Sequence, residues 1–420
     1  ANKIVNHERY WNDCSFIYQT LVNKYNIPKG NIYPLMSDGN DPGIDMRCVD
    51  GTYRSQPLDL DFDGVADIEL AASRSNVIAV LTDLSTRLQK DDHLFIYVID
   101  HGGDTKTAIP NSFIWLWGNE ILYDYELARL INPLSHKLAN INVVLGQCRS
   151  GGFIDELTKI GCVVASATSG GEDSQGCPDI PYDEFVYHWT CAINEATHTG
   201  ESVDSDMDKN GRVTMAEAFD YAKRHDRFYY NEHPQYVSTP ISVGEDLAFN
   251  YLPPSVDLYI KDNPEDTGKE PNLTTNQIWN SMSICIRNND DGIFDHQNPE
   301  YSPSHQTAYV YVKVHNRGKE KYTGGKWLKV YWGQASTGLT ANTWNGLETY
   351  NGEYPTGGGL EPVEIYSIEA GGYIVTSVEW PLPSLLANYP DENFHFCILA
   401  CIVDDPDYDP FMNGDSGVNL

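Results

Sequence analysis

The sequence predicts an α/β domain with a mostly parallel sheet, followed by an all-β sandwich. Between residues 10 and 250, apolar segments without alternation are separated by segments of helical periodicity, which is typical of a parallel sheet covered on both faces. After "NYLPPS" (250–255), apolar and polar residues alternate, and Gly, Pro and Asn fill the intervals, which is typical of an antiparallel sandwich. We therefore expect one domain at 1–250 and a second at 254–420.

The first domain is expected to alternate helices and strands. Helical periodicity is present at 11–25, 73–90, 124–139, 183–196 and 214–225, with Ser73 and Asp124 as N-caps. Strand-like apolar runs are present at 31–36, 93–100, 141–147 and 162–168. The segment 112–123 predicts a hairpin that turns at Gly118-Asn119.

The second domain is expected to contain alternating strands at 308–314, 327–332, 373–380 and 394–403. Segments 258–268 and 284–292 resemble each other as weak copies of one strand-plus-turn unit. The final "GDSGVNL" is not typical of a domain end, so we expect a truncated second domain.

Composition narrows the function classes. The chain has 420 residues, with 28 Lys+Arg against 60 Asp+Glu and a net charge of −32. We expect no nucleic-acid partner, because duplex binding needs a basic face, and we expect affinity for cations instead. Apolar runs are too short to predict a membrane span. The nine cysteines lack a CxxC pair, which argues against a dense disulfide framework but leaves one or two bridges open.

Two predicted strands end in reactive residues. "HLFIYVIDHGG" delivers His101, and "NVVLGQCRSGG" delivers Cys148. The carboxyl ends of parallel strands meet at one edge of the sheet, so this pair can form a thiol nucleophile and its proton-transfer partner. Either residue alone is better explained as structural, but both at strand ends before glycines favour catalysis.

These motifs resemble the caspase–legumain–gingipain class of cysteine peptidases. The surroundings are most similar to legumain (asparaginyl endopeptidase): 9–39 resembles its first helix and second strand, 41–53 its Pro-Gly-Ile loop, and 163–177 the segment after its fifth strand. The resemblance covers roughly 6–200 and implies a caspase-like α/β/α sandwich.

The resemblance also implies roles for matched positions. Cys148 would be the nucleophile, His101 the proton donor to the leaving amine, and the N–H groups of Gly102 and Cys148 the oxyanion hole.

The primary specificity pocket would contain Arg9, Ser174 and Asp183. A pocket with both charges suits a carboxamide, which is both acceptor and donor, so cleavage after Asn is expected first, and after Asp at lower pH.

Some positions depart from the family. Gln147 and Arg149 flank the cysteine where Ala and Glu are usual, and Arg149 is expected to favour the thiolate and to alter acceptance on the leaving side. The family's asparagine aligns near Asn6 or His7, which leaves a third catalytic residue open. The first core strand would precede Ala1, so we hypothesise a cleaved N-terminal segment retained as a companion piece.

Two acidic segments predict bound Ca²⁺. Segment 206–217 matches the EF-hand loop, with Gly211 at the turn; its expected ligands are Asp206, Asp208, Asn210, the Arg212 carbonyl, Thr214 and Glu217. Segment 59–69 resembles the shorter DxDxDG loops; its expected ligands are Asp59, Asp61, Asp63, the Val65 carbonyl, Asp67 and Glu69. A polar helix-capping loop remains the alternative for 206–217, and an acidic turn cluster is favoured over a third site at 287–301.

The sequence therefore predicts a secreted or cell-surface bacterial cysteine endopeptidase that acts on protein or peptide substrates, is stabilised by Ca²⁺ and carries a C-terminal Ig-like sandwich. One alternative keeps the class but cleaves after basic residues, as gingipain and clostripain relatives do; Arg9 argues against it. Another is a non-catalytic binding or adhesion protein on a peptidase scaffold; the His101–Cys148 pair argues against that.

Overall fold

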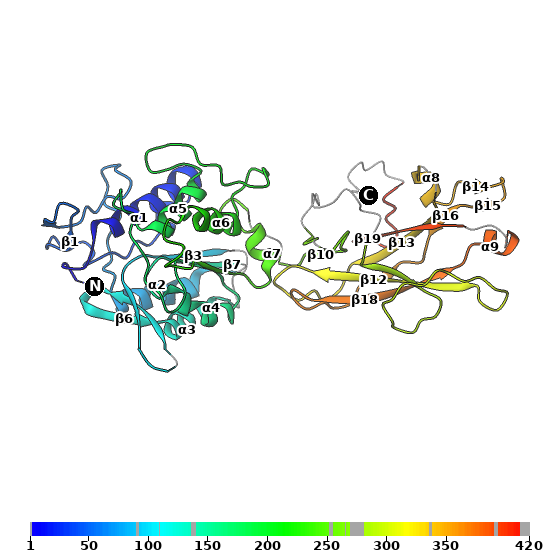
Figure 1. Ribbon diagram of the computed structural model, residues 1–420, viewed down its shortest axis with the longest axis horizontal. Coiled ribbons are helices and arrows are strands. Elements are labelled where there is room, and N and C mark those ends of the chain that lie inside the picture. The colour runs from blue at the N-terminus through cyan, green and yellow to red at the C-terminus, as the bar shows by residue number, and fades with distance from the viewer. Residues whose placement is uncertain are drawn as a thin grey trace. The chain divides into compact units, whose positions relative to one another are not determined.

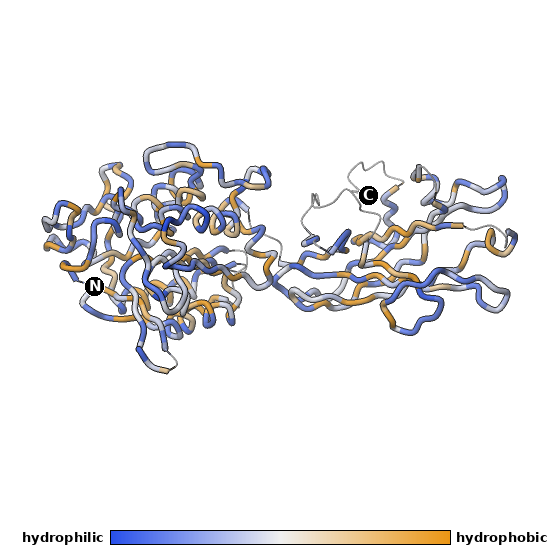
Figure 2. Tube along the Cα trace, viewed as in Figure 1, coloured by the Kyte–Doolittle hydropathy of each residue, from blue (hydrophilic) through white to orange (hydrophobic). Residues whose placement is uncertain are grey.

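The computed structural model describes residues 2–89, 92–108, 110–135, 140–251, 255–264, 266–268, 281–335, 338–389 and 394–411. The chain divides into two compact units, Ala1–Pro253 and Pro254–Leu420 (Figure 1). Hydrophobic residues are dispersed through both units (Figure 2), and no helix in the described ranges is long and apolar enough to cross a bilayer.

The first unit is built on a four-stranded sheet with the order β3-β7-β8-β9. Its strands are β3 (His93–Val98), β7 (Asn140–Leu145), β8 (Val163–Ser166) and β9 (Gln235–Val237). The first three are parallel, and β9 runs antiparallel to β8. This mostly parallel sheet in a mixed α/β unit fits a caspase-like fold.

Helices cover both faces of this sheet (Figure 1). One layer contains α1 (Glu8–Gln19), which continues as a π-helical turn at Thr20–Lys24, with α5 (Glu184–Asn194), α6 (Met215–His225) and the short α7 (Ile241–Asp246). The other contains α2 (Arg74–Arg87), α3 (Asp124–Ser135) and α4 (Ile154–Thr158), which follows a 3-10 turn at Ser150–Phe153.

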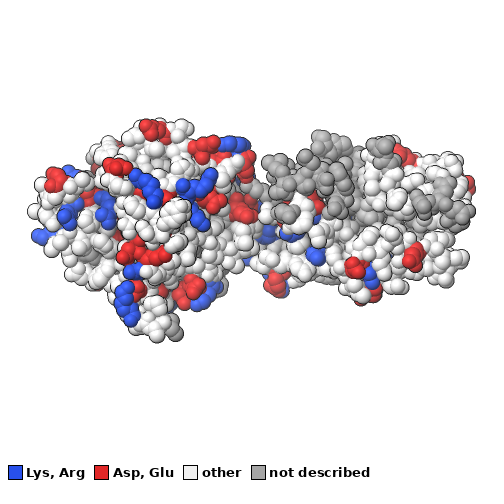
Figure 3. Space-filling model, viewed as in Figure 1, with Lys and Arg blue, Asp and Glu red and all other residues white. Residues whose placement is uncertain are grey.

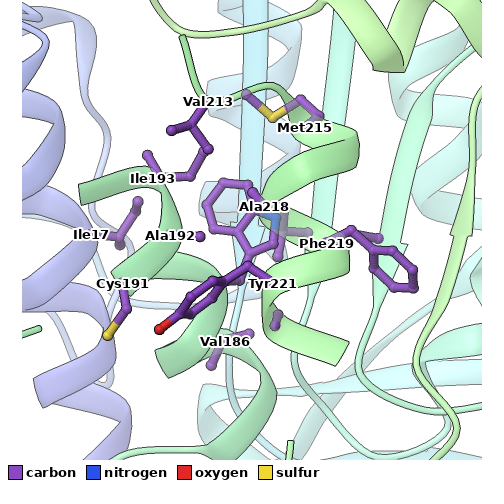
Figure 4. Packing of buried hydrophobic residues seen from close by; sticks show 14 of the residues in the cluster. Ile17, Val186, Cys191, Ala192, Ile193, Val213, Met215, Ala218, Phe219 and Tyr221 are labelled. Carbon is purple, nitrogen blue, oxygen red and sulfur yellow. The ribbon is translucent and has the colours of Figure 1, made fainter. Parts of the chain in front are cut away.

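The two layers have separate hydrophobic cores because successive strand side chains point to opposite faces. Val144 of β7 packs with the α1–α5–α6 layer, whereas its neighbours Val143 and Leu145 pack with the α2–α3–α4 layer. Figure 4 shows the first of these cores, to which α1 contributes Ile17, α5 contributes Ala192 and Ile193, and α6 contributes Ala218. Burial on both faces explains why β7 lacks hydrophobic alternation.

Local signals confirm several predicted elements. Ser73 caps α2 by accepting a hydrogen bond from the Asn76 N–H, and Thr214 forms a capping box with Glu217 at the start of α6. Helix α3 begins at Asp124, whose carboxylate accepts from the N–H groups of Ser112 and Tyr125. The predicted end of that helix, 136–139, lies outside the described residues.

The hairpin expected at 112–123 is confirmed. Strands β5 (Ser112–Leu116) and β6 (Glu120–Tyr123) pair antiparallel across a turn at Trp117–Asn119, and β4 (Gly102–Asp104) pairs with β5. A further small pair joins β1 (Met46–Arg47) to β2 (Tyr53–Arg54).

The predicted strand at 31–36 is wrong. Residues Lys29–Asn31 form a 3-10 turn, and Leu35 makes only an isolated bridge with Leu70. Pro34 lacks an N–H group, so this segment cannot form a continuous ladder of hydrogen bonds.

The second unit contains two four-stranded antiparallel sheets. One consists of β10 (Leu258–Tyr259), β11 (Ile284–Arg287), β12 (Thr307–Asn316) and β18 (Tyr373–Pro381). The other consists of β13 (Trp327–Gln334), β16 (Gly357–Gly359), β17 (Val363–Glu364) and β19 (Phe396–Val403). Val310 of β12, Val330 of β13 and Trp380 of β18 belong to one shared core.

The weak strand-plus-turn copies at 258–268 and 284–292 supply β10 and β11, which both pair with β12. Peripheral elements are the hairpin of β14 (Thr349–Tyr350) with β15 (Tyr354–Pro355) and the short helices α8 (Ala341–Trp344) and α9 (Ser384–Asn388). The four main predicted strands are present, and the Ig-like assignment of this unit stays a prediction.

Candidate active site

The ends of β3 and β7 bring the two predicted catalytic residues to one edge of the sheet. Val98 lies opposite Leu145 in the parallel ladder, and the Gly146 N–H donates to the Val98 carbonyl. Beyond this point the backbones of Gly102 and Cys148 lie against each other: a Cβ on Gly102 would lie 2.0 Å from the Cys148 carbonyl oxygen. Only glycine therefore fits beside the cysteine at this position.

The imidazole of His101 is half-buried and held by a main-chain carbonyl. Its Nε2 lies 3.0 Å from the Val5 carbonyl oxygen. A carbonyl can only accept, so Nε2 carries the proton and Nδ1 is the free base of the neutral ring. Burial lowers the pKa of His101, the Val5 carbonyl partly opposes this, and Arg9 lowers it further. The ring is therefore mostly neutral around pH 7.

The group that holds the His101 ring is the Val5 carbonyl, and neither Asn6 nor His7, the two candidates for a third catalytic residue, makes this contact. Asn6, one of the two candidates, donates instead to the Ser37 hydroxyl at 2.6 Å and to the Asp45 carbonyl at 2.9 Å. The ring of His7, the other candidate, lies edge-on to His101 at 5.9 Å. Sequence reasoning missed Val5 because a main-chain atom leaves no residue-type signal.

Cys148 is half-buried, and its Sγ lies 3.6 Å from the Ser174 hydroxyl. All nine cysteines lie in the described segments and none is in a disulfide there, so the bridges left open by the sequence are not formed. Burial raises the pKa of the Cys177 and Cys191 thiols of the same unit, which keeps them protonated.

Two of the predicted pocket residues form an ion pair. The Arg9 Nε lies 3.0 Å from each carboxylate oxygen of Asp183, although the two residues are 174 positions apart. Asp183 is buried at the start of α5, where its own N–H donates to the Asp13 carboxylate at 3.0 Å. The predicted residues thus fall into two contacts, Arg9 with Asp183 and Ser174 with Cys148.

Tyr10 links the ion pair to the histidine. Arg9 Nη2 donates to the Tyr10 hydroxyl at 3.0 Å, and this hydroxyl lies 3.3 Å from His101 Nε2. The Tyr10 side chain is buried, with 4% of its surface exposed. The only sequence signal for this contact is the position of Tyr10 next to Arg9.

Arg149, which departs from the family pattern, is neutralised by acidic neighbours. It has a left-handed backbone, with φ of 62°, and its guanidinium lies 3.3 Å from Asp104 and 3.1 Å from Asp173. Two carboxylates offset its charge, which weakens the expectation that Arg149 favours the thiolate. Gln147 is fully buried, and neither amide atom has a hydrogen-bond partner among the described residues.

Loop 206–217 has a donor set that fits a divalent cation. Carboxylate oxygens of Asp206, Asp208 and Glu217 lie within 4.8 Å of one another. Asp206 accepts from the N–H of Gly211, whose φ of 80° makes the required turn. The hydroxyl of Thr214 is engaged with Glu217 in the capping box. Hard carboxylate oxygens around one point suit Ca²⁺.

Loop 59–69 already encloses a positive charge. Carboxylate oxygens of Asp59, Asp61 and Asp67 lie within 4.8 Å of one another. The Lys29 ammonium lies 2.7 Å from Asp61 and 3.2 Å from Asp67, and it also reaches Asp63 at 2.8 Å. Two other predicted ligand residues, Val65 and Glu69, are exposed. Lysine thus supplies much of the charge balance that a cation would give here.

Acidic and basic side chains are interspersed on the face of the first unit that Figure 3 shows, and its described residues form no continuous basic stripe there.

Residues 70–242 match the model of the Peptidase C13 family, the legumain family. This segment includes β3, β7, His101 and Cys148, and the match supports a cysteine peptidase. A cysteine peptidase acts on protein or peptide substrates. No curated protein matches the chain.

Three solved structures illustrate the similarity, each at low sequence identity. Protein GSU0716 from Geobacter sulfurreducens has 15% identity and a TM-score of 0.29, over 40% of this chain and 74% of its own. DesR, a β-glucosidase from Streptomyces venezuelae, has 11% identity and a TM-score of 0.17, over 80% of this chain and 35% of its own. The β-glucosidase D2-BGL from Chaetomella raphigera has 13% identity and a TM-score of 0.17, over 79% and 40%. Scores this low carry no functional assignment.

Proposed function

We propose that the first unit is a cysteine endopeptidase in which Cys148 is the nucleophile and His101 the proton-transfer group. The observation that carries this proposal is the backbone contact between Gly102 and Cys148, which holds the two strand ends together. A nucleophile, a neutral imidazole and close main-chain groups are the parts that acyl transfer to a thiol needs.

The chemistry follows from the orientation of the ring. Nδ1 of the neutral His101 ring takes the proton of the Cys148 thiol, and the thiolate attacks the peptide carbonyl carbon. The N–H groups of Gly102 and Cys148 stabilise the oxyanion. The C–N bond then breaks, and the leaving amine takes a proton from Nδ1 of the His101 imidazolium. Water attacks the resulting thioester with His101 as base, which releases the new carboxyl group and restores the thiol.

The pocket is proposed to take an Asn side chain. Arg9 can donate to the amide oxygen, and Asp183 or Ser174 can accept from the amide nitrogen. A basic substrate residue would need an unneutralised negative charge in the pocket, and Arg9 already neutralises the Asp183 carboxylate through two 3.0 Å contacts. The ion pair therefore favours Asn over the basic-residue specificity of the gingipain alternative.

Loop 206–217 is proposed to hold Ca²⁺ through Asp206, Asp208 and Glu217. The bound ion would neutralise these carboxylates and fix the entry into α6, whose capping box contains Glu217. Sites of this type fill readily at extracellular Ca²⁺ concentrations, in keeping with a secreted or cell-surface protein. Loop 59–69 is the weaker candidate because of Lys29.

A peptide-library digest tests the peptidase proposal. Wild type, Cys148→Ala and His101→Ala are compared with the matched control Cys397→Ala, which removes a half-buried thiol from the second unit. We expect cleavage after Asn by wild type and by the control, and at least about a thousandfold less by the other two variants. Equal cleavage by Cys148→Ala and wild type would refute the proposal.

A further inference from the structure

The Tyr10 hydroxyl lies between Arg9 and His101. Arg9 donates to it at 3.0 Å, and His101 Nε2 lies 3.3 Å away on its other side. The phenol ring meets the imidazole edge-on, with centroids 5.6 Å apart and planes at 88°. The Arg9 guanidinium carbon lies 4.7 Å from the centre of the same phenol ring. One buried side chain thus contacts both functional groups.

The hydroxyl can serve both neighbours at once. Arg9 can only donate, and the single Nε2–H of His101 is shared between the Val5 carbonyl and the Tyr10 oxygen, so Tyr10 accepts from both neighbours. Burial raises the pKa of Tyr10 above its usual value, so the hydroxyl stays neutral. The Val5 carbonyl fixes one direction of the Nε2 hydrogen bond, and Tyr10 restrains the ring from the side of the pocket.

We propose that Tyr10 is a positioning residue that couples occupation of the Arg9–Asp183 pocket to the orientation of His101. This inference rests on the proposed peptidase function and extends it to how the substrate side chain is sensed. A side chain that engages Arg9 fixes the guanidinium, the guanidinium fixes the Tyr10 hydroxyl, and the hydroxyl restrains the imidazole.

This coupling predicts that pocket binding raises turnover as well as affinity. A residue that only shapes the pocket would change KM for a good substrate and leave kcat alone, because it contributes equally to the ground state and the transition state. A residue that orients the proton donor changes kcat, and here it should do so most for substrates that engage Arg9.

The test compares Tyr10→Phe, which removes only the hydroxyl, with wild type and a matched control. The control is Tyr25→Phe, which removes a hydroxyl that donates to the Ile193 carbonyl at 2.9 Å elsewhere in the unit. Peptides with Asn before the scissile bond are compared with the same peptides carrying Ala. For Tyr10→Phe we expect kcat on the Asn peptides to fall about tenfold, with KM within about threefold.

For Tyr10→Phe acting on the Ala peptides, we expect kcat within about threefold of wild type, because Ala does not engage Arg9. Tyr25→Phe should match wild type on both substrates. An unchanged Asn-to-Ala ratio of kcat in Tyr10→Phe overturns the coupling, as does a change confined to KM.

A second readout needs no turnover. The His101 ring is followed by NMR through a pH titration in full-length wild type, Tyr10→Phe and Tyr25→Phe, with His101→Ala to identify its signal. Loss of the hydroxyl acceptor should lower the pKa of His101 in Tyr10→Phe alone, while the neighbouring His7, Arg9 and Asp100 are unchanged. An unchanged pKa overturns the positioning role. If wild type cleaves no peptide, the peptidase proposal fails, and this titration still decides whether Tyr10 positions His101.

Discussion

Replacing Gly102 with alanine should abolish catalysis while leaving the first unit folded. The added Cβ would lie 2.0 Å from the Cys148 carbonyl oxygen and 2.7 Å from the Gln147 Cγ. Real Cβ atoms stay at least 3.0 Å from such atoms, so the two segments must separate by about 1 Å. A displacement of about 1 Å between reacting groups can lower the rate about a hundredfold, and here it also moves the oxyanion donors.

The assay is kcat/KM on an Asn peptide, together with the thermal midpoint of unfolding. Gly30→Ala is the matched control, because a Cβ there would meet nothing within 4 Å. We expect kcat/KM to fall at least about a hundredfold in Gly102→Ala and to stay within about twofold in Gly30→Ala. A Gly102→Ala protein with unchanged activity and stability would refute the inferred contact between the strand ends.

Three further predictions concern charge. Burial and Asp226 raise the pKa of Glu232, so the stability that this group contributes at low pH is lost as the pH rises from the usual glutamate pKa of 4.5 through the raised pKa. Glu232→Gln should therefore melt at a higher temperature than wild type at about pH 8 and at the same temperature at about pH 4. Equal melting temperatures at both pH values would contradict this. Glu217→Gln should weaken Ca²⁺ binding at least about tenfold by calorimetry, whereas unchanged affinity would exclude loop 206–217 as the site. Arg9→Lys should lower kcat/KM on Asn peptides at least about tenfold, because lysine lacks the planar array of donors that spans Asp183 and Tyr10. An unchanged kcat/KM would show that Arg9 does not bind the substrate side chain.

Periodicity and end signals predicted most of the core of the first unit. The apolar run of β7 needed no alternation because Val143 and Val144 face different helical layers, both of which exclude water. Ser73 was predictable as an N-cap because its hydroxyl accepts from the Asn76 N–H, which has no backbone acceptor in the first turn of the helix. The apolar content of 31–36 favours a strand, but Pro34 lacks the N–H group that a continuous ladder needs.

The candidate site was predictable only where residue type and strand order sufficed. His101 and Cys148 follow strands that are neighbours in the sheet, which is a rule of parallel topology. The Arg9–Asp183 contact joins segments from α1 and α5, and only the family resemblance put these residues together. The Val5 carbonyl leaves no trace in residue type. Local patterns in the sequence likewise do not predict contacts such as that of Lys29 with the aspartates of loop 59–69.

The identity of the nucleophile is directly testable, because Cys148 is one of nine cysteines that form no disulfide. A peptide that ends in Asn and carries a thiol-reactive electrophile is added in slight excess, and the modified cysteine is located by mass spectrometry. We predict one label per chain, on Cys148, and its loss in His101→Ala or after competition with an Asn peptide. Labelling spread over several cysteines, or labelling of Cys148 that is indifferent to His101 and to the Asn side chain, would contradict the assignment of Cys148 as the nucleophile.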